Sequence, residues 1–110
     1  MKPDALRGHL DALILAVLEK ESLHGYAVMQ ALQVSSGGAL DLPTGSLYPA
    51  LRRLERAGYL QSEWLQVAGR KRRTYSLTKA GRQALVTERS EWRDFAAVVE
   101  GVLRPGTSST

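Results

Sequence analysis

The residues of this sequence with the greatest capacity for chemistry are cations that lie close together. Residues 69–73 read GRKRR, a glycine followed by four consecutive positive charges, and Arg52, Arg53 and Arg56 lie a short way upstream. Residues 44–73 hold seven basic and two acidic residues, a net charge of +5, whereas the rest of the chain has a net charge of −1. Such a local positive field favours a polyanionic partner.

Other chemistry finds little support in the residue types. His9 and His24 are the only histidines and no cysteine occurs, whereas a metal site needs more donors at closer spacing. No nucleophile lies beside a base, and no glycine-rich phosphate loop is present. We therefore expect no enzyme activity, no metal and no cofactor, and we expect His24 to cap or hydrogen-bond at the start of a helix.

The size and hydropathy of the chain indicate one small globular protein of 110 residues. Its longest apolar run, LDALILAVL at 10–18, is too short to span a bilayer and contains Asp11. No basic region and cleavage site of a signal peptide flank this run. We expect a soluble cytoplasmic protein that does not contact a membrane.

Three helices are expected in the first half of the chain. The first has a helical apolar stripe formed by Leu6, Leu10, Leu13, Ile14, Val17 and Leu18. Ser22 is the expected N-cap of the second helix, which runs to about Ser36 and is stopped by Gly37 and Gly38. The third spans 44–57, with Ser46 as the N-cap, because Pro49 would then fall in the first turn, where proline is tolerated.

The second half predicts a hairpin and one long helix. Strands are expected near 59–66 and 74–77, joined by Ala68, Gly69 and the basic run. Thr78 is the expected cap of a helix to about Leu103, whose apolar seam repeats every seven residues at Leu85, Trp92 and Val99.

This order of elements predicts a mainly α protein with a small β-hairpin, a winged helix-turn-helix of three helices and a two-stranded wing, followed by a long C-terminal helix. We expect a winged-helix DNA-binding domain at 1–77, a dimerisation helix at 78–104 and a disordered tail at 105–110.

On the third helix the charges and the apolar residues lie on opposite sides. Arg52, Arg53 and Arg56 lie opposite the leucines, with Ser46 and Tyr48 near the helix start. Such a face suits a helix in a DNA major groove, where arginine contacts guanine or phosphate. The alternative is an ordinary solvated face that keeps the helix soluble.

The basic run strengthens the nucleic-acid interpretation. Four adjacent cations repel one another, and phosphates would relieve that repulsion and release counterions. We therefore predict that Arg70, Lys71, Arg72 and Arg73 form the tip of a wing on DNA. The alternative is a charge cluster that protects exposed strand edges.

Two helices are expected to need a partner chain. The first is apolar on most sides, and the last has a heptad-like seam. A homodimer would bury both, with its interface at Leu6, Leu10, Leu13, Leu85, Trp92, Phe95 and Val99.

Five segments resemble the PadR family of bacterial winged-helix transcriptional regulators, in its short form with one C-terminal helix. They are LRGHLDALILAVL (6–18), LHGYAVMQAL (23–32), GGALDLPTGSLYPALRRLERAGYL (37–60), GRKRRTYSLTKAGRQAL (69–85) and EWRDF (91–95).

The resemblance implies a homodimeric repressor on a pseudo-palindromic DNA operator, with 44–57 as recognition helix and 68–73 as wing. It places Tyr26, Ser46, Tyr48 and the basic residues of the wing at the DNA surface. Thr44, at the start of the recognition helix, is expected to contact DNA as well. Pro43 and Thr44 depart from the polar cap and acidic residue that are common in the family.

The resemblance also implies release of the repressor by a small-molecule or stress signal, because family members often bind planar molecules near the dimer interface. Trp92 could stack on such an aromatic effector; the alternative is that it belongs to the dimer core. The second functional hypothesis is a winged-helix protein–protein interaction module with a basic face for an acidic partner.

A salt titration tests the proposed wing contact. Replacing Arg70 and Lys71 with alanine should flatten the log–log dependence of DNA affinity on salt by roughly one unit for each lost phosphate contact. An unchanged slope would refute the contact.

Overall fold

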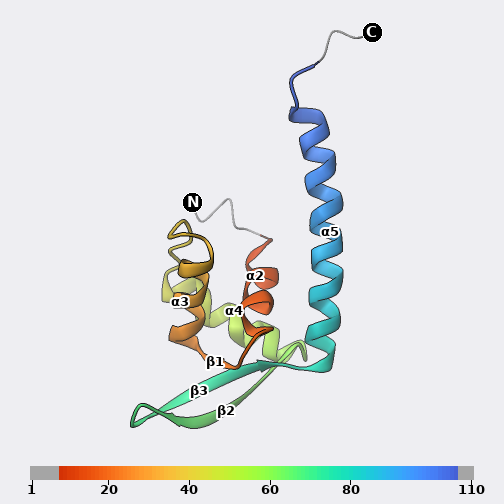
Figure 1. Cartoon of the computed structure of the whole chain (residues 1–110). Helices are drawn as coiled ribbons and strands as arrows, with labels where there is room; N and C mark the ends of the chain where they lie inside the picture. The colour runs from red at the N-terminus through yellow and green to blue at the C-terminus, as the bar shows by residue number, and fades with distance from the viewer. Residues whose placement is uncertain (1–7, 107–110) are drawn as a thin grey trace.

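A computed structural model describes residues 8–106 of the chain, so Leu6 and most of the predicted tail at 105–110 lie outside the described residues. The elements are α2 (Leu10–Leu18), β1 (Leu23–His24), α3 (Gly25–Ser35), α4 (Thr44–Arg56), β2 (Leu60–Val67), β3 (Arg70–Leu77) and α5 (Lys79–Leu103). The predicted fold class is confirmed: the protein is a winged helix with a small antiparallel sheet and a long C-terminal helix (Figure 1).

The core lies where α2, α3 and α4 pack over the sheet, and α2 also packs against α5 (Figure 1). The leucines of α4 that were predicted to lie opposite the arginines are buried: Leu47, Leu51 and Leu54. Val28 and Leu32 of α3 are buried as well. α2 is less enclosed than its composition suggested. Only Ile14, Leu15 and Leu18 are fully buried in it, while Leu10, Leu13 and Val17 are half-buried.

The second helix starts later than predicted. Ser22 is not its N-cap, because Leu23 and His24 form β1 and pair with Tyr75 and Thr74 of β3. The sheet therefore has three strands in the order β1-β3-β2 rather than two. His24 is the N-cap, as its capping role predicted, and its Nδ1 accepts a hydrogen bond of 3.2 Å from the amide of Ala27.

The start of α4 also differs from the prediction. Pro43 has an extended backbone, and its carbonyl accepts hydrogen bonds from the amides of Ser46 and Leu47. Ser46 therefore lies inside the helix and is not its N-cap, and Pro49 falls in the second turn. Pro49 cannot donate to the carbonyl of Gly45, but both residues are exposed, so water can bond that carbonyl.

The basic run lies in a strand rather than in the turn. β2 and β3 pair along their whole length, from Leu60 opposite Leu77 to Val67 opposite Arg70. The turn consists of Ala68 and Gly69 alone, with φ of 51° and 80°. Two consecutive residues of positive φ match the twist of a two-residue hairpin. Because the hairpin closes so tightly, all four cations are placed on β3.

Several bonds at one junction fix the direction of α5. The hydroxyl of Thr78, the predicted N-cap, accepts from the amide of Gly81 at 3.0 Å and donates to the carbonyl of Gly58 at 2.6 Å. The amide of Thr78 donates to the carbonyl of Tyr59 at 3.1 Å. Further along the helix, Leu85 is 2% exposed and belongs to the protomer's own core, so it is not available to a partner chain.

Gly81 provides a test of this junction. A Cβ atom at this position would lie 2.1 Å from the carbonyl oxygen of Tyr59, a backbone atom that cannot rotate away. Gly81→Ala should therefore lower the free energy of unfolding by about 1–3 kcal/mol, measured by chemical denaturation. Gly101→Ala in the same helix is the matched control. No atom lies within 4 Å of its added Cβ, so the better helix propensity of alanine should preserve or raise stability. Equal stability of the two variants would contradict the close contact.

The cap at His24 should make stability depend on pH. Burial, with a smaller contribution from Arg72, lowers the pKa of His24 from its ordinary value of 6.5. The unfolded chain therefore takes up this proton at a higher pH than the folded chain does. The stabilisation is complete above about pH 6.5 and is lost as the pH falls through the lowered pKa of the folded state.

His24→Asn is the comparison, because asparagine can accept the capping bond but does not titrate. Denaturant unfolding over a pH series should show a shallower decline for His24→Asn than for the wild type. Parallel declines would show that His24 is not the titrating group.

Candidate nucleic-acid interface

The exposed side of α4 carries most of the side chains predicted to contact DNA. Burial of Leu47, Ala50, Leu51 and Leu54 on one side of this helix forces the intervening positions outward. The exposed residues include Thr44, Ser46, Arg52 and Arg56. Within residues 8–106, neither Arg52 nor Arg56 forms an ion pair with an acidic side chain. Their charges are therefore available to an external anion.

Arg53 behaves differently from the other two arginines of α4. Its guanidinium forms a salt bridge with the carboxylate of Asp11 in α2, and both side chains remain substantially exposed. Exposed ion pairs of this kind contribute little to stability. The pair nevertheless holds Arg53 toward α2, apart from Arg52 and Arg56.

The two tyrosines predicted at the DNA surface lie where α3 meets α4. Tyr26, in the first turn of α3, is 47% exposed. Tyr48 is half-buried, and its ring packs against Gly25, where an added Cβ atom would lie 2.4 Å from the ring. Glycine at position 25 therefore lets α3 approach α4 closely and holds the Tyr48 ring at the start of the recognition helix.

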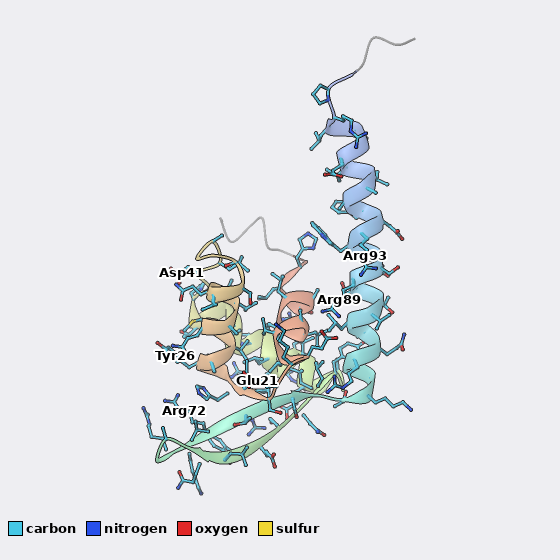
Figure 2. All side chains as sticks on the ribbon, viewed as in Figure 1. Glu21, Tyr26, Asp41, Arg72, Arg89 and Arg93 are labelled. Carbon is cyan, nitrogen blue, oxygen red and sulfur yellow. The ribbon has the colours of Figure 1, made fainter. Side chains whose placement is uncertain are left out.

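The four cations of β3 divide between two faces of the wing, because successive strand residues point to opposite faces. Arg70 and Arg72 share one face, and Lys71 and Arg73 share the other. Figure 2 shows Arg72 on the wing and Tyr26 at the end of α3 that adjoins it. Arg72 lies near enough to His24 to help lower its pKa.

Arg73 is engaged within the protein. The carbon of its guanidinium lies 5.7 Å from the centre of the Trp64 ring, directly across the hairpin, and one of its nitrogens lies 3.5 Å from the carboxylate of Glu55 in α4. The charge of Arg73 also acts on the phenol of Tyr75. Burial is the larger effect there and raises the pKa of Tyr75, so the phenol stays neutral at physiological pH. The wing thus exposes Arg70 and Lys71 freely, whereas Arg73 links it to α4.

The far part of α5 is an exposed apolar surface. Five of its large hydrophobic residues are more than half exposed: Trp92, Phe95, Val98, Val102 and Leu103. Val99, a predicted interface residue, is half-buried. Figure 1 shows that this part of the helix extends beyond the other described elements. Such a surface is typical of a contact with another chain.

An ion pair anchors the near part of α5 to α2. Arg89 forms two hydrogen bonds with the carboxylate of Glu19, at 2.8 and 3.0 Å, and Figure 2 shows Arg89 on the side of α5 that faces α2. The Arg89 guanidinium lowers the pKa of Glu19. The pair therefore persists at mildly acidic pH.

A groove of about 770 Å³ lies between α2 and α5. Trp92 lines it. The centre of its indole ring lies 5.2 Å from the centre of the His9 ring, which it meets edge-on, and 5.9 Å from the centre of the Phe95 ring.

The described residues include no group of three or more histidines or carboxylates placed to hold a metal. No helix within 8–106 is both long and apolar enough to cross a membrane.

Three side chains of this region were not predicted to have a role: Asp11, Glu55 and Trp64. Each forms a contact between different elements, with Asp11 and Arg53 as far as 42 residues apart, so the spacing within one helix or strand gives no signal for the contact. For Trp64 alone a pattern was available, because its alternation with Ser62 places the two on one face of β2.

Comparisons with known proteins agree with this geometry. The model of the transcriptional regulator PadR-like family matches residues 14–87. The transcriptional regulator Rv3488 of Mycobacterium tuberculosis is 49% identical over 57 residues, which cover 52% of this chain and 53% of that protein.

Solved structures are similar over most of the chain. A PadR family transcription regulator from Clostridium difficile is 33% identical, with a TM-score of 0.77 over 87% of this chain and 99% of that one. A transcriptional regulator from Clostridium thermocellum is 25% identical, with a TM-score of 0.84 over 92% of this chain and 99% of that one. From the winged-helix fold, the basic helix and hairpin, and these matches, it follows that the chain belongs to the PadR-like family of transcriptional regulators, whose members bind DNA.

Proposed function

We propose that the protein is a homodimeric repressor that binds a pseudo-palindromic operator in double-stranded DNA and is released by a small aromatic molecule or a stress signal. In this proposal residues 1–77 bind DNA and residues 78–104 form the dimerisation helix. α4 enters the major groove, and the hairpin of β2 and β3 lies on the adjacent backbone.

The observation that carries the proposal is a set of exposed cations with no acidic partner among the described residues. Arg52 and Arg56 of α4 and Arg70 and Lys71 of β3 are all exposed and form no ion pair within 8–106. Their mutual repulsion weakens the isolated fold, and DNA phosphates would neutralise it. Asp11 and Glu55 already pair with Arg53 and Arg73. The unpaired cations therefore indicate an anionic partner more directly than the net charge of the region does.

The exposed apolar surface of α5 supports the dimer. Trp92, Phe95, Val98 and Val102 follow one another along α5 at intervals of three or four residues, and each is more than half exposed in the protomer. A second copy of the same helix would remove them from water. Twofold symmetry would then set the two recognition helices about 34 Å apart, one turn of DNA.

The groove between α2 and α5 supports a regulatory ligand. Its walls include the aromatic rings of His9, Trp92 and Phe95, and a volume of about 770 Å³ suits a small planar molecule. A molecule held there would contact both the DNA-binding part and the dimerisation helix. Trp92 would then serve as both an interface residue and a ligand contact.

The test is a gel-shift titration at low salt with the DNA upstream of the protein's own gene, together with sedimentation to measure the oligomeric state. Arg52→Ala and Arg56→Ala should each weaken binding by about 1–3 kcal/mol if the arginine reads a base. A loss that is similar on every duplex would indicate a phosphate contact.

Arg104→Ala is the matched control, because it removes the same charge at the far end of α5. It should leave the affinity nearly unchanged. Equal losses in all three variants, or a wild-type dimer that binds no duplex at low salt, would contradict the proposal.

A further inference from the structure

One acidic side chain lies inside the most basic region of the protein, and its contacts give it a role. Residues 44–73 contain only two acids, Glu55 and Glu63. If this region only attracts DNA by its positive charge, the two carboxylates should weaken that attraction equally. The structure distinguishes them, because Glu63 is exposed and has no hydrogen bond or ion pair within the described residues. Glu55 is bonded to both strands of the wing.

The carboxylate of Glu55 joins three elements at one oxygen. Its Oε2 accepts a hydrogen bond of 2.6 Å from the hydroxyl of Ser62 in β2. The same oxygen lies 3.5 Å from Nη2 of Arg73 in β3. Glu55 belongs to the last turn of α4, so a single atom connects the recognition helix to the two strands of the hairpin.

The Arg73 guanidinium also lies near a ring of the wing, while its side chain remains 44% exposed. Trp64 lies directly across from Arg73 in the hairpin, and the guanidinium carbon is 5.7 Å from the centre of its ring. Ser62, Trp64 and Arg73 share one face of the hairpin because strand residues alternate. The cluster of Glu55, Ser62, Trp64 and Arg73 therefore connects the end of α4 to the two strands of the wing.

We propose that Glu55 is a positioning residue for DNA recognition: through Ser62 and Arg73 it sets the angle of the wing relative to α4. This inference rests on the proposed DNA binding. Bases are read by the recognition helix, whereas phosphate contacts fix its register on the duplex. A wing held at one angle allows both sets of contacts at once on the right sequence. A wing that has lost this link can still attract any duplex by charge.

This role predicts opposite effects on affinity and on specificity. Without the Glu55 carboxylate, Arg73 gains freedom to meet phosphate, so binding to unrelated DNA should strengthen. The preferred duplex should gain less or lose affinity, because the wing no longer supports the register of α4. A carboxylate that acts only through its charge would raise both affinities by the same factor.

Glu55→Gln and Glu63→Gln form a matched pair, since each removes one negative charge from residues 44–73. The probes are a duplex that the wild-type protein enriches from a random library and a shuffled duplex of the same composition. We expect Glu55→Gln to lower the ratio of the two affinities roughly three- to tenfold. Glu63→Gln should strengthen both and leave their ratio unchanged.

Tryptophan emission gives a second measurement that does not depend on DNA. Trp92 contacts His9 and Phe95 rather than this cluster, so a difference between the emission spectra of the two variants reports Trp64. Glu55→Gln should shift the emission because Arg73 leaves the ring, and Glu63→Gln should not.

The outcomes separate this inference from the proposed function. Equal affinity ratios for the two variants, or identical emission spectra, would overturn the role of Glu55. A wild-type protein that binds neither duplex would instead refute DNA binding itself. If Glu55→Gln does not fold, Ser62→Ala removes one of the two partners of the carboxylate, and it must lower the ratio in the same direction for the inference to stand.

Discussion

The packing of one side of α4 into the core is the constraint on which the rest of the surface depends. Leu47, Ala50, Leu51 and Leu54 are all at most 3% exposed, and their burial at helical spacing fixes the rotation of the helix about its axis. The same rotation presents Arg52 and Arg56 to solvent. The side of α4 on which an arginine lies thus decides whether it can contact a partner. Hydrophobic burial, rather than electrostatics, supplies the free energy that holds these arginines on the outer side.

Electrostatics then refines this surface. Of the seven cations between 44 and 73, Arg53 is drawn toward α2 by Asp11, and Arg73 is drawn into the corner between α4 and the wing by Glu55. The two ion pairs lie at different edges of α4 and connect it to different neighbours. They remove charge from the periphery and leave it concentrated on α4 and the end of the hairpin. The basic region is therefore a small number of directed charges rather than a diffuse positive field.

How far the sequence predicts this structure depends on the range of the interactions. The N-cap at Thr78, the glycine stop after α3 and the buried side of α4 follow from residues a few positions apart, and all were predicted. Ser22 and Ser46 were wrongly predicted as N-caps, because residues 23–24 are recruited by a strand 50 residues away and because Pro43 supplies the carbonyl that starts α4. The basic run was assigned to a loop because the positive φ of Ala68, rare for alanine, was not anticipated. The partners of Arg53 and Arg73 could not be predicted, since no local rule connects residue 53 with residue 11 or residue 73 with residue 55.

The junction at Thr78 and Gly81 has a mechanical consequence. A helix of 25 residues is about 37 Å long at about 1.5 Å per residue, so a tilt of about 5° at its base would displace its far end by about 3 Å. The bonds from Thr78 to the Gly58 and Tyr59 carbonyls attach that base to the turn that immediately follows α4. The start of α5 is therefore attached directly behind the recognition helix, and any difference in the direction of α5 at that turn is largest at its far end.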